Sequence, residues 1–194
     1  MSTKLVSVSH LEVVRKIANE SSKVKIGGDQ IVVPSDARIH TLRIRYNPAR
    51  PWQEAINVVG PDIPSHYNVW KVGDQYPPTG TEEVEEDLVL INYPDGSGDW
   101  GKALAWGKSR GLEKTVPREA FAVGDQYPNL HNEIGMNPVY VVATTPCTFQ
   151  GGQQACYVWW DDAAREANLY WTSDLNEQND WFLFRKTVLK TKML

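Results

Sequence analysis

Short runs of apolar residues, broken by turn-forming residues, dominate this sequence and predict strands rather than long helices. In the first half of the chain, extended apolar runs cover residues 41–46 and 87–92. In the last third, runs rich in Val, Tyr, Trp and Phe alternate with smaller or polar residues. These runs predict an antiparallel meander of four strands at 139–144, 155–160, 168–172 and 181–185.

Other segments carry apolar residues at helical spacing and predict short helices between the strands. A proline begins the first and precedes the third, where its missing N–H costs no hydrogen bond, and a glycine follows the first two. These helices are expected at 51–59, 101–110 and 118–123. Upstream, an amphipathic helix over 6–19 precedes a β-hairpin over 23–33 that turns at two glycines.

The hexapeptide Val-Gly-Asp-Gln-Tyr-Pro occurs twice, at 72–77 and at 123–128. Before each copy stand an extended apolar run, an Asn-Pro or Tyr-Pro turn and a Trp-x-x-Ala helical start. A shared period of about fifty residues is typical of a repeated supersecondary unit. We therefore expect an internal duplication of a strand–helix unit, covering about 41–77 and 87–128.

Each hexapeptide also offers an acidic residue, Asp74 or Asp125, and two such carboxylates could form paired ligand sites. The alternative is a repeated turn, in which Gly-Asp makes the bend and Pro prevents its continuation. Turn chemistry favours the structural role.

Together these patterns predict an α+β fold. Residues 1–37 form an N-terminal helix and hairpin, and residues 38–194 form a single compact domain. That domain contains the duplicated unit and ends in a Trp-rich sheet, one face of which should be strongly aromatic. The side chains expected on the aromatic strands are Tyr157, Trp159, Tyr170, Phe182 and Phe184.

Charge and composition exclude several classes of partner. The net charge is −4 and the 20 Lys and Arg residues are dispersed, whereas a nucleic-acid binder normally concentrates them on one face. No run approaches the roughly 18 apolar residues of a membrane span, and the first residues lack the apolar segment of a secretion signal. We expect a cytoplasmic protein that binds neither nucleic acid nor membrane.

Few residues suit metal or cofactor chemistry. The two cysteines, Cys147 and Cys156, could face each other across a hairpin, but a reducing cytoplasm favours free thiols, and two cysteines are too few for a zinc site. The four histidines have no metal-ligand spacing, and nucleotide-binding and hydrolase motifs are absent. We expect no metal, no cofactor and no recognisable catalytic set.

A cluster of aromatic and polar residues near the end of the chain is the best candidate for a ligand site. Flat aromatic walls with a few convergent polar groups are what a small-ligand pocket requires. The alternative is that the tryptophans fill the core and two aspartates make a turn. The candidate ligand-binding residues are Trp160, Asp161, Asp162, Trp171, Asn179 and Asp180.

The order of elements over residues 87–187 resembles the C-type lectin-like fold. The elements are a strand, a Trp-x-x-Ala-Leu-x-Trp helix, a helix opening with Val-Pro-Arg-Glu at 116–119, and Trp-rich strands that close on 181–185. The resemblance implies two helices before a small set of strands. The family's calcium and sugar site does not transfer, because its Glu-Pro-Asn or Gln-Pro-Asp tripeptide is absent and two cysteines cannot make its two disulfides. The closing segments also resemble bacterial proteins of unknown activity, which implies no function.

The favoured function is a non-enzymatic binding module that recognises a small polar ligand or a protein through a tryptophan-rich surface around Trp160, Trp171 and Asp180. One alternative is a hydrolase acting on a glycan, with Asp161 or Asp162 paired with Asp180 as acid and base. Another is a structural subunit, in which a second copy of the chain covers the aromatic patch. The sequence leaves the oligomeric state open.

Overall fold

The computed structural model describes residues 23–26, 29–60, 65–162 and 164–187. The helix expected over 6–19 lies outside these residues. The strands are β1 (Lys23–Ile26), β2 (Asp29–Val32), β3 (Arg38–Tyr46), β4 (Val84–Asn92), β5 (Leu112–Lys114), β6 (Val139–Ala143), β7 (Cys147–Phe149), β8 (Gly152–Trp160), β9 (Arg165–Trp171) and β10 (Asp180–Lys186). The helices are α2 (Trp52–Asn57), α3 (Tyr67–Trp70), η1 (Gly73–Gln75), α4 (Trp100–Ser109), α5 (Pro117–Gln126) and α6 (Leu130–Ile134).

Eight of the described strands form one mixed sheet, so the α+β class is confirmed at this level. The strands β3, β4, β10, β6, β8 and β7 follow one another, while β5 also pairs with β10 and β9 pairs with β8. Only β6 and β10 run parallel; the other pairs are antiparallel. The hairpin expected over 23–33 is present as β1 and β2, which form a separate two-stranded sheet.

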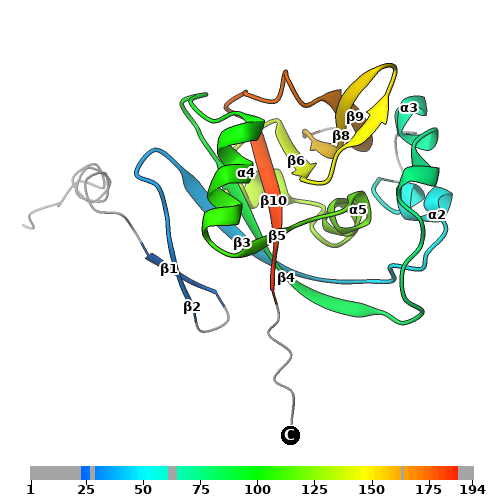
Figure 1. Cartoon of the computed structure of the whole chain (residues 1–194), viewed down its shortest axis with the longest axis horizontal. Helices are drawn as coiled ribbons and strands as arrows, with labels where there is room; N and C mark the ends of the chain where they lie inside the picture. Colours follow the sequence, from blue (N-terminus) through cyan, green and yellow to red (C-terminus); the bar gives the residue numbers. More distant parts are fainter. Residues whose placement is uncertain (1–22, 27–28, 61–64, 163, 188–194) are drawn as a thin grey trace, which may run out of the picture.

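The C-terminal strands do not form the expected simple meander. β10 lies between β4 and β6 in the middle of the sheet, rather than beside β9 (Figure 1). The side chains at 181–184 are all buried and apolar, so β10 is apolar on both faces. A strand with two apolar faces is most stable where helices or loops cover both sides, and the centre of the sheet provides this position.

The two faces of the sheet pack into two separate cores. On the first face, here the α5 face, Leu88, Leu183 and Val158 pack with residues of α2, α3, α5 and α6. On the second, here the α4 face, Val89 and Phe182 pack with α4. Side chains of one strand point alternately to the two faces, so the parity of a residue number decides which core it joins.

Helix α4 covers only part of its face. It packs on β5 and β10, where Gly107 permits a close approach because a Cβ there would overlap the Phe184 ring. The α4 face of β6, β8 and β9 carries half-buried and exposed tyrosines instead of a helix within the described ranges. This uncovered area is where a ligand could reach the sheet.

The two hexapeptides adopt different local structures but make matching contacts. The first forms η1, and the second is the last turn of α5 and its C-cap, so the helix runs further than the expected 118–123. In the first copy, the Gln75 side chain makes two hydrogen bonds with the backbone of Thr148 in β7, and the Tyr76 hydroxyl donates to the Thr145 carbonyl. In the second copy, the Gln126 side chain makes the same two hydrogen bonds with the backbone of Arg45 in β3, and the Tyr127 hydroxyl donates to the Arg43 carbonyl.

These contacts agree with the structural role favoured for the hexapeptide. Asp74 and Asp125 are both exposed, and η1 and the end of α5 lie against strands at opposite ends of the sheet order. Trp52 of the first unit belongs to the core on the α5 face, whereas Trp100 of the second packs against the core on the α4 face. The duplication, the boundary near residue 37 and the C-type lectin-like resemblance stay predictions.

Candidate functional site

The six residues selected from the sequence do not lie on one surface. Trp160 and Trp171 point to the α5 face, whereas Asp180 points to the α4 face. Trp160 is 0% exposed, and its indole N–H donates to the Tyr127 carbonyl across 3.1 Å. Trp171 is 37% exposed, and its ring covers Gly152. Trp160 is therefore a core residue and cannot contact a ligand at the surface.

The other polar residues of that set mainly shape turns. Asp161 Oδ1 accepts a hydrogen bond from the Ala164 N–H at 2.8 Å and so closes the β8–β9 turn. The exposed Asp162 lies 3.5 Å from His131 Nε2. The Asn179 carbonyl accepts from the Tyr140 N–H. This agrees with the alternative interpretation of these aspartates as turn residues.

Asp180 is the member of the set that lines a half-open hollow, named here the tyrosine pocket. The pocket holds about 110 Å³, several times the space that one water needs. It opens on the uncovered part of the α4 face, where β6, β8, β9 and the segment before β10 each contribute. Its lining residues are Tyr140, Tyr157, Tyr170, Leu175, Glu177 and Asp180.

Sheet register brings the aromatic side chains of the pocket together. Asp180 and Tyr140 are partners in the parallel β6–β10 pair, and Tyr157 and Tyr170 come from the adjoining strands β8 and β9. The Tyr140 and Tyr157 rings have centroids 5.7 Å apart at 89°, and those of Tyr157 and Tyr170 are 6.2 Å apart at 83°. Such edge-to-face pairs fix ring orientation, so the walls of the pocket are preformed.

The carboxyl group of Asp180 is buried at the base of this wall. The residue is 4% exposed, and one oxygen accepts from the Glu177 N–H at 2.9 Å. Burial raises the pKa of Asp180 to about 6, and the nearby Glu177 acts in the same direction, while the Glu177 N–H opposes it. Burial also raises the pKa values of Tyr140 and Tyr157, so both remain protonated near neutral pH.

A second hollow adjoins the tyrosine pocket and shares Tyr140 with it. It is more open and lies over the start of β6 and the end of β8. Its lining residues are Asn137, Pro138, Tyr140, Trp159, Asp161 and Asp162. Trp159 and Trp160 thus point to opposite faces of the sheet, as alternation predicts. Trp160 belongs to the core on the α5 face, whereas Trp159 lines this second hollow.

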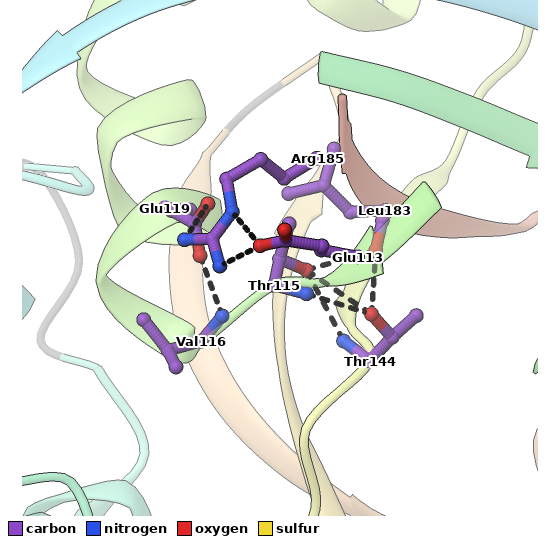
Figure 2. A network of polar contacts seen from close by, with 7 residues as sticks. All are labelled: Glu113, Thr115, Val116, Glu119, Thr144, Leu183 and Arg185. Atoms are coloured by element: carbon purple, nitrogen blue, oxygen red, sulfur yellow. Dashed lines mark hydrogen bonds and ion pairs between the residues drawn. The ribbon is translucent and has the colours of Figure 1, made fainter. Parts of the chain in front are cut away.

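A cluster of ionisable residues on the α5 face is the other candidate (Figure 2). The Arg185 guanidinium binds Glu113 at 2.6 Å and lies 3.5 Å from Glu119 Oε1. Glu119 Oε2 accepts from the Val116 N–H at 2.6 Å, which caps the start of α5. Burial raises the pKa of Glu119 to about 7, although Arg185 opposes the change.

This cluster has a structural explanation. Glu119 is 0% exposed and lines none of the hollows found among the described residues. Figure 2 shows Thr115 and Thr144 beside it, with both hydroxyls donating to the Leu183 carbonyl where β5 and β6 separate along β10. The cluster fixes that junction and the N-terminus of α5, and we do not treat it as a binding site.

Sequence reasoning placed Tyr157 and Tyr170 on an aromatic face but did not select them, and it missed Tyr140. Alternation along β6 is the pattern that points to Tyr140: its neighbours Val139 and Val141 are fully buried on the α5 face, so the Tyr140 side chain lies on the α4 face. That signal was insufficient without knowing that β10 pairs with β6, since only this pairing puts Asp180 beside Tyr140.

The remaining observations restrict other chemistries within the described part of the chain. Cys147 and Cys156 are both buried free thiols, and burial raises the pKa of each. Among the described residues, no group of three or more His, Cys, Asp or Glu side chains could hold a metal ion. None of the helices in the described ranges is long and apolar enough to cross a membrane.

No protein-family model matches the chain, and no curated protein or solved structure matches it.

Proposed function

We propose that the protein is a non-enzymatic binding module that holds a small polar ligand in the tyrosine pocket. The observation that carries this proposal is the pocket itself: three ordered tyrosine rings and a buried carboxylate on a part of the sheet that no described helix covers. Apolar walls with a few fixed polar groups favour binding of a small ligand over a flat protein interface.

The hydroxyl groups support a polar ligand. Those of Tyr140, Tyr157 and Tyr170 have no protein partner among the described residues, and none is buried without a partner. They are thus accessible to solvent and able to donate or accept a hydrogen bond. The proposal moves the recognition surface from the tryptophans to the tyrosines, since Trp160 is inaccessible.

The test is a thermal-shift screen of sugars, nucleosides, amino acids and amines against the wild type and Tyr170→Leu. Tyr170 is 40% exposed, so its replacement leaves the core unchanged. A ligand should stabilise the wild type and lose its effect in Tyr170→Leu. The matched control is Tyr67→Leu, which removes a 58% exposed tyrosine from α3. A ligand response that is equal in all three proteins places binding elsewhere and contradicts the proposal.

A second candidate function is hydrolysis of a glycan, supported by the pKa of about 6 at Asp180, which suits a general acid. The partners first considered, Asp161 and Asp162, line the neighbouring hollow rather than the tyrosine pocket. Turnover of chromogenic glycosides by the wild type, abolished in Asp180→Asn, would establish this function in place of simple binding.

We also propose that the segments at about 41–77 and 87–128 are copies of one ancestral unit. The matching Gln and Tyr contacts of the two hexapeptides support this. In addition, Tyr76 and Tyr127 have nearly the same backbone angles, φ −126° and ψ 67° against φ −120° and ψ 64°. The C-type lectin-like resemblance adds no ligand class to the proposal, because the family's calcium-binding tripeptide is absent.

A further inference from the structure

The tyrosine pocket combines aromatic rings with uncompensated negative charge. Asp180 lies at its base and Glu177 is an exposed residue of its lining. Among the described residues, neither carboxylate forms an ion pair, and no Lys or Arg lines the pocket. A buried carboxylate normally has a cationic partner, because removal from water otherwise costs several kcal/mol.

The rings of the pocket also have no cation over them from any described residue. Within the described ranges, cation–π contacts involve Tyr67, Tyr93 and Trp52, and none involves the three tyrosines of the pocket. A cation within about 6 Å of a ring centroid is attracted to the ring face, and this attraction grows when water is excluded. The rings of Tyr140 and Tyr170 each lie nearly perpendicular to that of Tyr157, and the hollow that all three line is the position where more than one such contact can form.

We infer that the tyrosine pocket binds an organic cation, an alkylated ammonium group whose methyl groups contact Tyr140, Tyr157 and Tyr170 while its charge faces Asp180. The inference rests on the proposed function and names the ligand class. An anion would meet two carboxylates, and a neutral sugar would leave the Asp180 charge uncompensated. A hard metal ion requires six or more oxygen ligands and gains little from aromatic walls.

The adjoining hollow indicates where the rest of a ligand would lie. It shares Tyr140 with the tyrosine pocket and adds Trp159 and Pro138. An ammonium group in the pocket could therefore continue toward Trp159. A free quaternary amine and an alkylated lysine in a peptide share this chemistry, and the experiment below separates them.

The test is calorimetric titration of the full chain with choline and with its neutral isostere, in which a quaternary carbon replaces the nitrogen. Choline should bind at least about tenfold more tightly than the isostere, because the shape is the same and only the charge differs. Free trimethyllysine and a peptide containing it form the second arm. Tighter binding of the peptide identifies a protein segment as the source of the cation; equal binding identifies a small molecule.

Three variants locate the effect. Tyr170→Leu should weaken choline binding at least about tenfold, and Tyr170→Phe, which keeps the ring, should weaken it less. Asp180→Asn should also weaken it about tenfold, since it removes the charge but keeps an oxygen to accept from the Glu177 N–H. Tyr67→Leu is the control outside the pocket and should bind as the wild type does. Circular dichroism and thermal unfolding of each variant confirm that it is folded.

Two results would overturn the inference, and they are distinguishable. If choline and its isostere bind equally, and Tyr170→Leu weakens both, the pocket binds ligands without recognising charge, so the proposed function stands and the ligand class is wrong. If no compound of either panel gives saturable binding to the folded wild type, both the ligand class and the proposed function fail.

Discussion

The side-chain amide of Gln126 pairs with the backbone of Arg45 as a neighbouring strand would. Its Oε1 accepts from the Arg45 N–H at 3.0 Å, and its Nε2 donates to the Arg45 carbonyl at 2.7 Å. Gln75 repeats the arrangement on Thr148, at 2.8 and 2.9 Å. Unpaired backbone groups at the edge of a sheet are a template for aggregation, and the repeated Gln satisfies one residue at each of two edge strands.

Replacing this glutamine should destabilise the protein and expose the edge. Gln126→Ala removes two hydrogen bonds to a partly solvated backbone, so we expect a loss of about 1–2 kcal/mol in the free energy of unfolding. Urea unfolding followed by circular dichroism measures it. Asp125→Ala is the matched control, one exposed residue earlier, and should change stability by less than about 0.5 kcal/mol. Equal effects would show that the amide pairing contributes nothing.

Two tryptophans of the candidate set, Trp160 and Trp171, should lose different amounts of stability on the same substitution. Trp160→Phe leaves a cavity in the core and deprives the Tyr127 carbonyl of its donor, so we expect a loss of roughly 1–3 kcal/mol. Trp171→Phe at a 37% exposed position should cost less than about 1 kcal/mol. Chemical unfolding followed at the far-ultraviolet signal compares them; a smaller loss for Trp160→Phe would contradict its assignment to the core.

The buried pair of threonines at the β5–β6 junction should be sensitive to loss of one hydroxyl. Thr144 Oγ1 accepts from the Thr115 N–H at 2.9 Å, so Thr144→Val leaves that buried donor unsatisfied. The expected loss is about 1–3 kcal/mol. Thr41→Val makes the same change at an exposed strand position and should be nearly neutral. Equal denaturation midpoints for the two variants would contradict this account.

Glu119 should make stability fall as the pH rises through its folded pKa. Because that pKa is raised to about 7, the folded state binds more protons than the unfolded state between about pH 4.5 and about pH 7. The free energy of unfolding therefore decreases over this window, by up to roughly 3 kcal/mol from this group. Unfolding of the wild type and Glu119→Gln at about pH 5 and about pH 8 tests it. The variant should show a smaller decrease, and Glu54→Gln, at an exposed position of α2, should follow the wild type.

Binding of choline to the tyrosine pocket should weaken as the pH falls through about 6. Protonation of Asp180 removes the charge that faces the ligand, and its pKa is about 6 in the folded protein. The other ionisable groups that face Asp180 are Glu177 and the three tyrosines of the pocket. Burial raises the pKa values of Tyr140 and Tyr157, so these two do not titrate in this range. Titration from about pH 5 to about pH 8 should show affinity rising with pH in the wild type and a flatter profile in Asp180→Asn. Parallel profiles would contradict the assignment of the pH dependence to Asp180.

Several local elements followed from the sequence because short-range rules decide them. Pro51 and Pro117 stand at helix starts, the two strands of the expected 23–33 hairpin pair antiparallel, and the expected strands appear within a few residues of their predicted bounds. The hexapeptide was expected to be structural, which its contacts support. Its second copy nevertheless continues α5, since nothing before Pro128 prevents a helix from forming.

The candidate site shows the limit of sequence patterns. Alternation separated Trp159 from Trp160 but did not say which of them faces the core. That choice depends on the pairing of β8 with β6, and on α5 covering one face while α4 covers only part of the other.

The sequence by itself determined the class of the fold, the positions of most strands and of the helices α2, α4 and α5, and the alternation that gives each strand two different faces. Only the tertiary structure decided that β10 inserts between β4 and β6. In the sequence, 46 residues separate the end of β4 at Asn92 from the start of β6 at Val139. Local propensity cannot encode such a choice, because it depends on which long-range pairing buries both apolar faces of β10. That pairing places Asp180 beside Tyr140, and it thereby creates the tyrosine pocket.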